Sequence, residues 1–187
     1  MLLTPTTASL PEIALITGLL TAVPAGFALI APASAEKWFK KFPRSVWPGR
    51  VIMALCVVWA VAWLVIMPFD FLKVLHPYLW IIMPLFIAGT WFFMPELLSC
   101  RAFGCLIALA ATPMLSSAQW HPSLMRYFVI VYAYVLAVAG MFYIALPYLV
   151  RDHITWTFAG PARTRAVSAA FAVLGFILIF GYWGFGE

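Results

Sequence analysis

Six apolar runs constrain this chain more than any other feature, because each is close to the length that a helix needs to cross a membrane. A spanning helix needs about 20 predominantly apolar residues. The runs cover residues 12–32, 51–69, 77–95, 102–118, 124–150 and 166–183, which leaves no stretch long enough for a soluble domain. They predict an all-α polytopic membrane protein, a single helical membrane domain over residues 1–187. Its six transmembrane helices form three hairpins with cytoplasmic turns.

The composition supports a membrane protein and argues against nucleic-acid binding. The chain is 66% hydrophobic and 9% charged, whereas a soluble domain has about 45–50% apolar and about 25% charged residues. The net charge of +5 comes from basic residues that lie between the apolar runs. At that depth anionic lipid headgroups are the expected counter-charge. We therefore expect membrane lipids and other membrane proteins as partners, and no nucleic acid.

Residues 36–50 hold five of the eleven Lys and Arg residues. Lys37, Lys40, Lys41 and Arg44 recur at spacings of three and four, with aromatic side chains between them. This pattern predicts a short amphipathic helix in the plane of the membrane interface, with its rings at headgroup level. A solvated loop is the alternative. Pro48 and Gly49 are expected to end this helix before the second span.

The distribution of basic residues predicts the orientation of the chain. The turns after the first, third and fifth runs carry nine Lys and Arg residues, and the opposite side carries Lys73 and Arg126. The positive-inside rule places the nine-residue side in the cytoplasm and both termini outside. We expect the first run to be retained, because no Lys or Arg precedes it as in a signal peptide. The small size and strong charge bias favour a bacterial cytoplasmic (inner) membrane.

The residues expected at the lipid headgroups lie in the first and third of these turns. They are Lys37, Trp38, Lys40, Lys41, Arg44, Arg50, Arg151, Arg163 and Arg165. These two turns also resemble each other. Pro32 precedes Arg50 by 18 positions, and Pro147 precedes Arg165 by the same interval. The match suggests two similar cytoplasmic elbows that share a docking face.

Small side chains predict where helices approach each other closely. Gly104, Ala108 and Thr112 fall four residues apart in the fourth run. Ala133 and Ala137 form a second small pair in the fifth run. Such stripes let helix backbones approach closely in a membrane. We therefore expect the fourth run, the shortest of the six, to lie at the centre of the bundle.

Few residues are candidates for chemistry. The apolar runs hold no ionisable side chain near their centres, where one charge costs about 2.5–3.5 kcal/mol on insertion scales. This argues against proton-coupled transport. Asp70, His76 and His121 are candidates for a polar site on the outer face, and Met114 and Met125 beside His121 would suit a soft metal. The identity of any cofactor stays open.

The function favoured by these features is that of a non-catalytic scaffold or accessory subunit of a larger membrane assembly. One alternative is a channel or carrier for a neutral small solute, which requires a polar-lined cavity near mid-membrane. A second is an intramembrane enzyme acting on lipid. That reading requires His121 or His153 within about 3.2 Å of a partner group in an accessible pocket.

Overall fold

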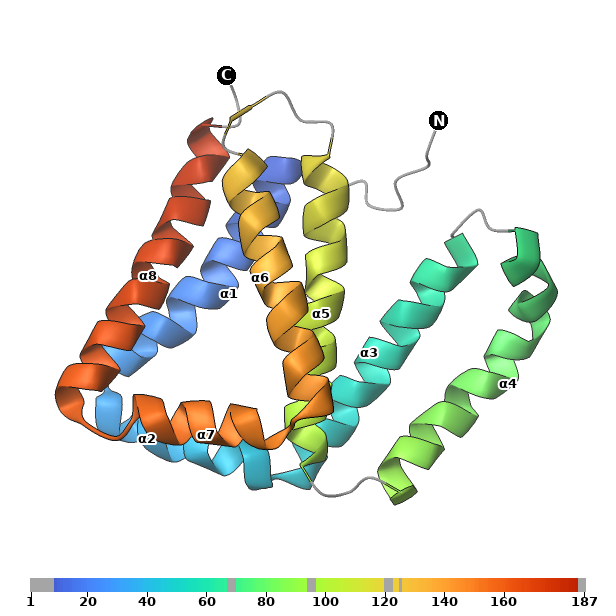
Figure 1. Cartoon of the computed structure of the whole chain (residues 1–187), viewed down its shortest axis with the longest axis horizontal. Helices are drawn as coiled ribbons and strands as arrows, with labels where there is room; N and C mark the ends of the chain where they lie inside the picture. Colours follow the sequence, from blue (N-terminus) through green and yellow to red (C-terminus); the bar gives the residue numbers. More distant parts are fainter. Residues whose placement is uncertain (1–8, 67–69, 94–96, 120–122, 125, 185–187) are drawn as a thin grey trace.

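The computed structural model describes residues 9–66, 70–93, 97–119, 123–124 and 126–184, except the side chains of residues 66, 70–76 and 182–184. This described part is all helical (Figure 1). Its elements are α1 (Leu10–Ile30), α2 (Pro32–Lys41), the 3-10 turn η1 (Phe42–Arg44), α3 (Val46–Ile66), α4 (Asp70–Phe93), α5 (Leu98–Ala118), α6 (Arg126–Ala145), α7 (Tyr148–Thr157) and α8 (Pro161–Gly184).

Five of these helices are long and apolar enough to cross a membrane: α1, α3, α5, α6 and α8. A shorter apolar stretch, Pro77–Phe93, lies in α4. Large apolar side chains such as Leu85 and Phe93 are exposed along the long helices. Exposed apolar surface on this scale suits lipid and not water. The chain therefore has the make-up of a multi-span helical membrane protein.

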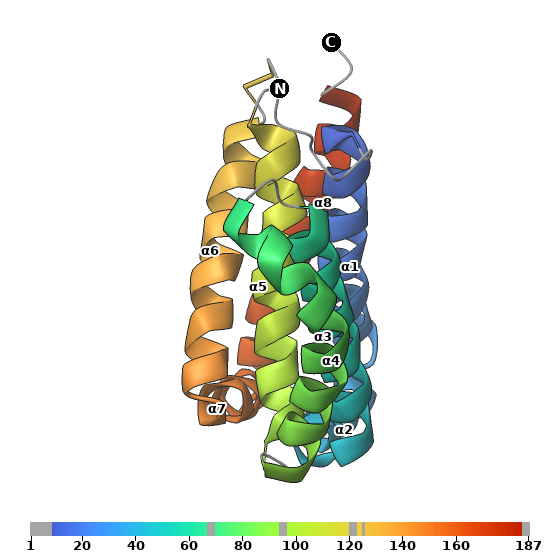
Figure 2. The ribbon, with the colours of Figure 1, turned by 90° about the vertical axis from the view of Figure 1, so that its right-hand side faces the viewer.

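The helices pack in two antiparallel pairs and one outlying pair. α1 packs along α8, and α5 packs along α6; α5 also contacts α3, which carries α4 on its other side (Figures 1 and 2). Since α5 also touches α1, η1 and α7, it occupies the central position expected for it. It is not the shortest span, because its helix covers 21 residues and begins at Leu98.

Glycine residues allow the close approach of the helices in both the α5–α6 pair and the α1–α8 pair. A Cβ added to Gly140 of α6 would lie 2.7 Å from the Gly104 carbonyl oxygen and 2.8 Å from the Ala108 Cβ and nitrogen. At the other crossing a Cβ on Gly175 of α8 would meet the Ala22 Cβ and nitrogen at 2.8 Å. Both pairs thus bring backbones together at positions where no larger side chain fits.

The two pairs converge at one end of the molecule and separate toward the other. The main buried cluster joins the start of α1 and the end of α5 to the start of α6 and the end of α8; its members are Leu10, Ile13, Ala14, Ala111, Met114, Ala118, Val129, Ala133 and Leu178. The opposite end, called here the elbow end, is closed below by α2 and α7 (Figure 1). The elbow helices α2 and α7 thus form the base of a triangular arrangement.

Several helix boundaries differ from the sequence-based expectation. The fifth run was expected to form one long helix over 124–150, but α6 ends at Ala145 and α7 starts at Tyr148 in a new direction. Pro147 is the physical reason, since proline has no N–H for the helical ladder. Pro48 and Gly49 do not end a helix, because they lie in the first turn of α3. Proline is tolerated in the first turn of a helix, because the N–H group that it lacks would have no partner within the helix there.

The other two differences extend helices into segments expected to be loops. α4 begins at Asp70, and α8 begins at Pro161. The three expected hairpins would pair α1 with α3, α4 with α5 and α6 with α8, but in the described residues none of these is a main packing pair. Elbow helices join the first and last of these pairs. An elbow helix of ten residues is about 15 Å long, whereas directly packed helices lie about 8–10 Å apart. The elbows therefore hold the joined spans apart.

Candidate functional site

The candidate site is the elbow end, where two helices turn out of the spanning direction. Ala31 leaves helical geometry between α1 and α2, with φ −130° and ψ 66°, and Pro32 begins α2. Pro147 plays the corresponding part before α7. α2 and α7 are each ten residues long. Arg50 and Arg165 are each the fifth residue of the helix that follows. The repeat suggested by the Pro-to-Arg spacing thus corresponds to two elbows of the same length.

Aromatic contacts tie the two elbows to each other and to the spans. The rings of Phe39 in α2 and Phe158 after α7 stack with centroids 5.8 Å apart. Phe42 in η1 meets Phe103 in α5 edge-to-face at 5.9 Å, and Phe103 stacks on Tyr143 in α6 at 6.4 Å. Aromatic pairs at such distances contribute about 0.5–1.5 kcal/mol each beyond the area they bury. The elbows therefore form one braced floor.

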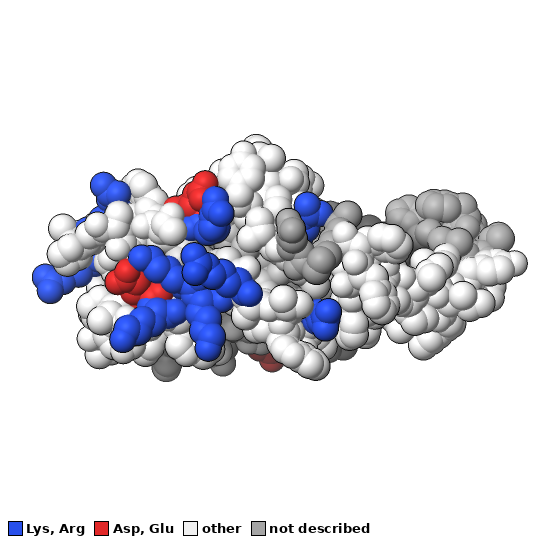
Figure 3. Space-filling view, turned by 90° about the horizontal axis from the view of Figure 1, so that it is seen from below, with Lys and Arg blue, Asp and Glu red and all other residues white. Residues whose placement is uncertain are grey.

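The outward surface of this floor is basic. Figure 3 shows Lys and Arg side chains gathered over the elbow end. A cavity of about 290 Å³ lies between the elbows, lined by Lys40, Pro43, Arg44, Arg151, Ile154 and Thr155. We call this lining the elbow face. It brings together three of the residues expected at the lipid headgroups, from α2, η1 and α7.

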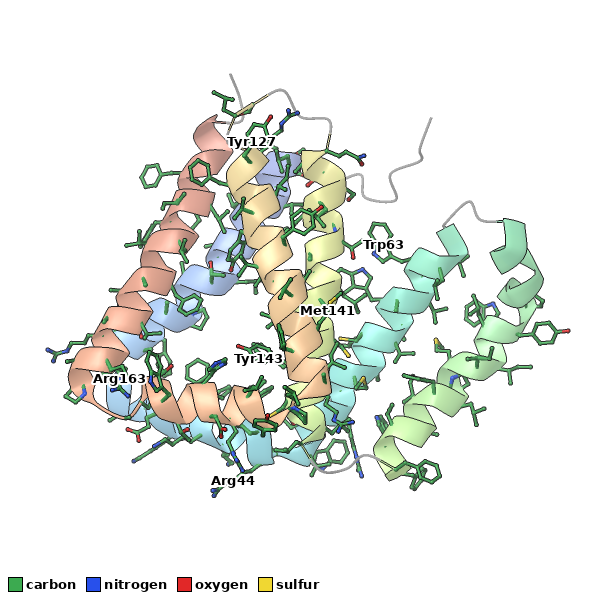
Figure 4. All side chains as sticks on the ribbon, in the orientation of Figure 1. Arg44, Trp63, Tyr127, Met141, Tyr143 and Arg163 are labelled. Atoms are coloured by element: carbon green, nitrogen blue, oxygen red, sulfur yellow. The ribbon has the colours of Figure 1, made fainter. Side chains whose placement is uncertain are left out.

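Two cations of the elbow face have acidic neighbours. The Lys40 Nζ lies 2.6 Å from Glu36 Oε1, and the Arg151 Nε lies 3.2 Å from Asp152 Oδ1. These pairs are exposed, so they leave the cations accessible to other anions. Arg44 has no acidic partner among the described residues and projects away from the helices (Figure 4). The three cations and two carboxylates leave one positive charge for an external anion.

The remaining predicted headgroup residues are dispersed. Lys37, Trp38 and Lys41 are exposed on α2, and Arg165 is exposed on α8. Arg163 lies over the Trp156 ring at 4.9 Å and donates to its carbonyl oxygen at 3.5 Å. These residues border the elbow face without lining its cavity.

Arg50 takes a different position from the other basic residues. Its guanidinium carbon lies 5.6 Å from the centre of the Trp91 ring in α4, and its Nε is buried. A Cβ added to the neighbouring Gly49 would lie 2.6 Å from the Ser99 backbone nitrogen, so α3 and α5 are in close contact here. The Ser99 hydroxyl donates to the Ser45 carbonyl oxygen. This end of α3 is thus fixed against α4 and α5 and is not part of the elbow face.

The predicted helix-packing residues lie along the α5–α6 contact. Gly104 and Ala108 approach Gly140 as described above, and Ala133 is fully buried in the main cluster. Ala137 packs against the same cluster, and Thr112 is half-buried. Gly140 was missed, although it continues the stripe of small residues three positions beyond Ala137.

The predicted outer-face site lies outside the described side chains. His121 is not among the described residues, and Asp70 and His76 are described only as helical backbone in α4. Among the residues that the structure describes, no group of three His, Cys, Asp or Glu residues is placed to hold a metal ion.

A second cavity, missed by the sequence reasoning, lies on the other side of α7. It has a volume of about 550 Å³ and is lined by Tyr134, Val135, Val138, Ala139, Phe142, Tyr143, Leu149 and His153. The Tyr143 hydroxyl and His153 Nδ1 are 3.0 Å apart, within hydrogen-bond distance. Pro147 was the signal in the sequence that could have predicted this pair, because a helix break there places Tyr143 in α6 and His153 in α7.

The elbow end therefore combines a basic outward face with an apolar inward groove, an arrangement suited to a membrane interface. Comparisons with protein-family models, curated proteins and solved structures give no significant match for this chain.

Proposed function

We propose that this protein is a non-catalytic scaffold or accessory subunit of a larger membrane assembly. Its six spans, with α4 as the sixth, cross a bacterial cytoplasmic membrane with the elbow end in the cytoplasm and both termini outside. Nine of the eleven Lys and Arg residues lie on the elbow side, in α2, η1 and α7 and near the starts of α3, α5 and α8, and the positive-inside rule supports this orientation.

One observation carries the proposal: two elbows distant in sequence are braced into a single basic face. Stacked Phe39 and Phe158 join them, and Lys40, Arg44 and Arg151 line the cavity between them. Because the Phe39–Phe158 stack joins the two elbows, the backbone positions that carry the cations are fixed before a partner arrives, which lowers the ordering cost of binding. Anionic headgroups and an acidic cytoplasmic segment of a partner subunit are the counter-charges that this face suits.

The test is site-specific crosslinking in the native membrane, with a photoreactive residue at position 41 beside the elbow face. We expect one partner subunit to crosslink there, and its yield to fall about tenfold in Arg44→Glu. Truncating one partner of a hydrogen-bonded charge pair that a complex buries costs about 2–5 kcal/mol. A tenfold loss, which corresponds to about 1.4 kcal/mol, is therefore a conservative threshold. Arg165→Glu is the matched control, because Arg165 is also exposed at the elbow end but lies outside the cavity.

The proposal fails if the chain purifies from mild detergent as a monomer and carries solute flux in liposomes, which would favour the carrier. It also fails if Arg165→Glu reduces the crosslink as much as Arg44→Glu does. In that case only net charge matters, and no specific face is involved.

A second candidate is an intramembrane enzyme acting on lipid, and the Tyr143–His153 contact favours it. The distance of 3.0 Å satisfies the requirement set from the sequence for His153, and the pair lies in an open groove. An imidazole held by a phenol can exchange a proton with a bound substrate. Turnover of phospholipid in vesicles that is lost in His153→Phe would support this function over the scaffold.

A further inference from the structure

The groove between α6 and α7 has two unlike parts. Its wall is a continuous stripe of α6 with apolar side chains, including Val135, Val138 and Phe142. At its corner, where α6 meets the floor formed by α7, the Tyr143 hydroxyl and the His153 ring form a polar pair. Figure 4 shows Tyr143 projecting from α6 above α7. A site with an apolar wall and one polar corner suits an amphiphile.

The polar pair keeps one hydrogen-bond donor in either tautomer of the histidine. If the Tyr143 hydroxyl donates to Nδ1, the Nε2–H of His153 remains available. If Nδ1–H donates to the phenol oxygen, the hydroxyl hydrogen remains available. The corner therefore offers a donor to an oxygen acceptor, such as the ester carbonyl of a lipid.

The dimensions of the groove match one lipid chain. Its wall runs along α6 from Tyr134 to Tyr143, which is about 13 Å at 1.5 Å per residue. Half of the hydrocarbon core of a bilayer is about 15 Å thick. The cavity volume of about 550 Å³ falls within the range of roughly 300–1,000 Å³ that is typical of ligand sites.

The geometry points to a binding site for one glycerophospholipid of the elbow-side leaflet. One acyl chain lies along the α6 wall, and an ester oxygen accepts a hydrogen bond from the Tyr143–His153 pair. This inference does not depend on the proposed docking of a partner subunit.

The test titrates a phosphatidylcholine that carries a diazirine in one acyl chain into the purified full chain, held in detergent micelles that contain no other lipid. We expect labelling at Val135, Val138 and Phe142 that saturates and is competed by unlabelled phospholipid. Labelling of Leu85 and Phe93 on α4, which are also exposed and apolar, is expected to rise in proportion to the probe without competition.

Two variants and a control sharpen the result. Ala139→Trp fills the groove, and we expect it to reduce the saturable labelling more than tenfold. His153→Phe keeps a ring at an exposed position but removes its hydrogen bonds, and we expect about two- to tenfold weaker binding, which corresponds to one hydrogen bond. Val131→Trp is the control, since Val131 is exposed on α6 but does not line the groove.

Folding of each variant is checked by its elution as a single species in size-exclusion chromatography. If Ala139→Trp does not fold, His153→Phe alone decides the matter. Non-saturable labelling of α6 at the level of α4 would show annular lipid only and would overturn the proposal. So would saturable labelling that is unchanged in His153→Phe and in Ala139→Trp.

Discussion

The α5–α6 crossing allows a direct test of how this fold is held together. In Gly140→Ala, the new Cβ would lie 2.7–2.8 Å from the Gly104 carbonyl oxygen and from two atoms of Ala108. Carbon atoms normally approach each other to about 3.5–4.0 Å, so the helices must separate by several tenths of an ångström or more. Overpacking of this kind costs about 1–3 kcal/mol.

The matched control is Gly26→Ala in α1, where an added Cβ has nothing within 4 Å. Both substitutions replace a helical glycine by alanine, which favours the helix by about 0.8–1.0 kcal/mol. The propensity gain cancels in the comparison, so the difference between the two variants isolates the clash. We expect Gly140→Ala to be less stable than Gly26→Ala by about 1–3 kcal/mol.

The assay is reversible unfolding of the detergent-solubilised protein by increasing mole fraction of sodium dodecyl sulfate, followed by circular dichroism. Gly18→Ala provides a second measurement, because its Cβ would meet the Gly175 carbonyl oxygen at 2.8 Å on the other helix pair. In the double variant Gly18→Ala/Gly140→Ala, the two changes in unfolding free energy should add within about 0.5 kcal/mol, as expected for separate sites. Equal stability of Gly140→Ala and Gly26→Ala would refute the close crossing.

Three further predictions concern the elbow end. Thr164→Val removes the buried hydroxyl that donates to the Thr157 carbonyl oxygen at 2.9 Å. We expect it to lower the unfolding free energy by about 1–3 kcal/mol in the same assay, and by more than Thr155→Val, which removes an exposed hydroxyl. Lys41→Cys, in a variant lacking the three native cysteines, should react with an impermeant maleimide from the cytoplasmic side, and reaction from the outside alone would reverse the proposed orientation. Phe39→Ala removes the stack on Phe158 and should broaden the distance distribution between spin labels on α2 and α7. Trp38→Ala is the control, because Trp38 is 75% exposed; equal distributions in the two variants would mean that the stack does not hold the elbows together.

Five of the six expected spans form helices long and apolar enough to cross a membrane, and most of the basic stretch is helical, in α2 and η1. Both features were predictable because they depend on local composition. A run of about 20 apolar residues has few alternatives to a spanning helix in a membrane. In residues 36–44, the alternation of cations and rings predicts a helix in the interface. These signals are read from neighbouring residues, so no knowledge of the tertiary structure is needed.

The break before α7 was missed for a physical reason. Apolar residues continue through Pro147 to Val150, and a hydropathy criterion does not distinguish a spanning helix from the apolar side of an interfacial one. The proline carried the information, since it interrupts the hydrogen-bond ladder of a helix. Its position 18 residues before Arg165 matches that of Pro32 before Arg50. This match predicts two similar turns, but it does not give the residue at which the span ends.

Local sequence patterns also do not predict which helices pack against each other. A small residue on a helix face indicates that some backbone approaches closely, but it does not indicate which one. Gly18 and Gly175 meet each other in the structure, as do Gly104 and Gly140. A glycine stripe looks the same in the sequence whichever helix it contacts, so the pairing of the first and last helices was not predictable.

The pairing of α1 with α8 has a consequence for how the protein is made. Gly18 and Gly175 are 157 positions apart, so at about 5–20 residues per second the ribosome needs roughly 8–30 s to synthesise the intervening chain. During this interval α1 is inserted without its partner, and its glycine face is open to lipid and to other nascent helices. Membrane insertase or chaperone contacts with α1 should therefore persist until α8 has emerged, and a chain stopped before Pro161 should retain them.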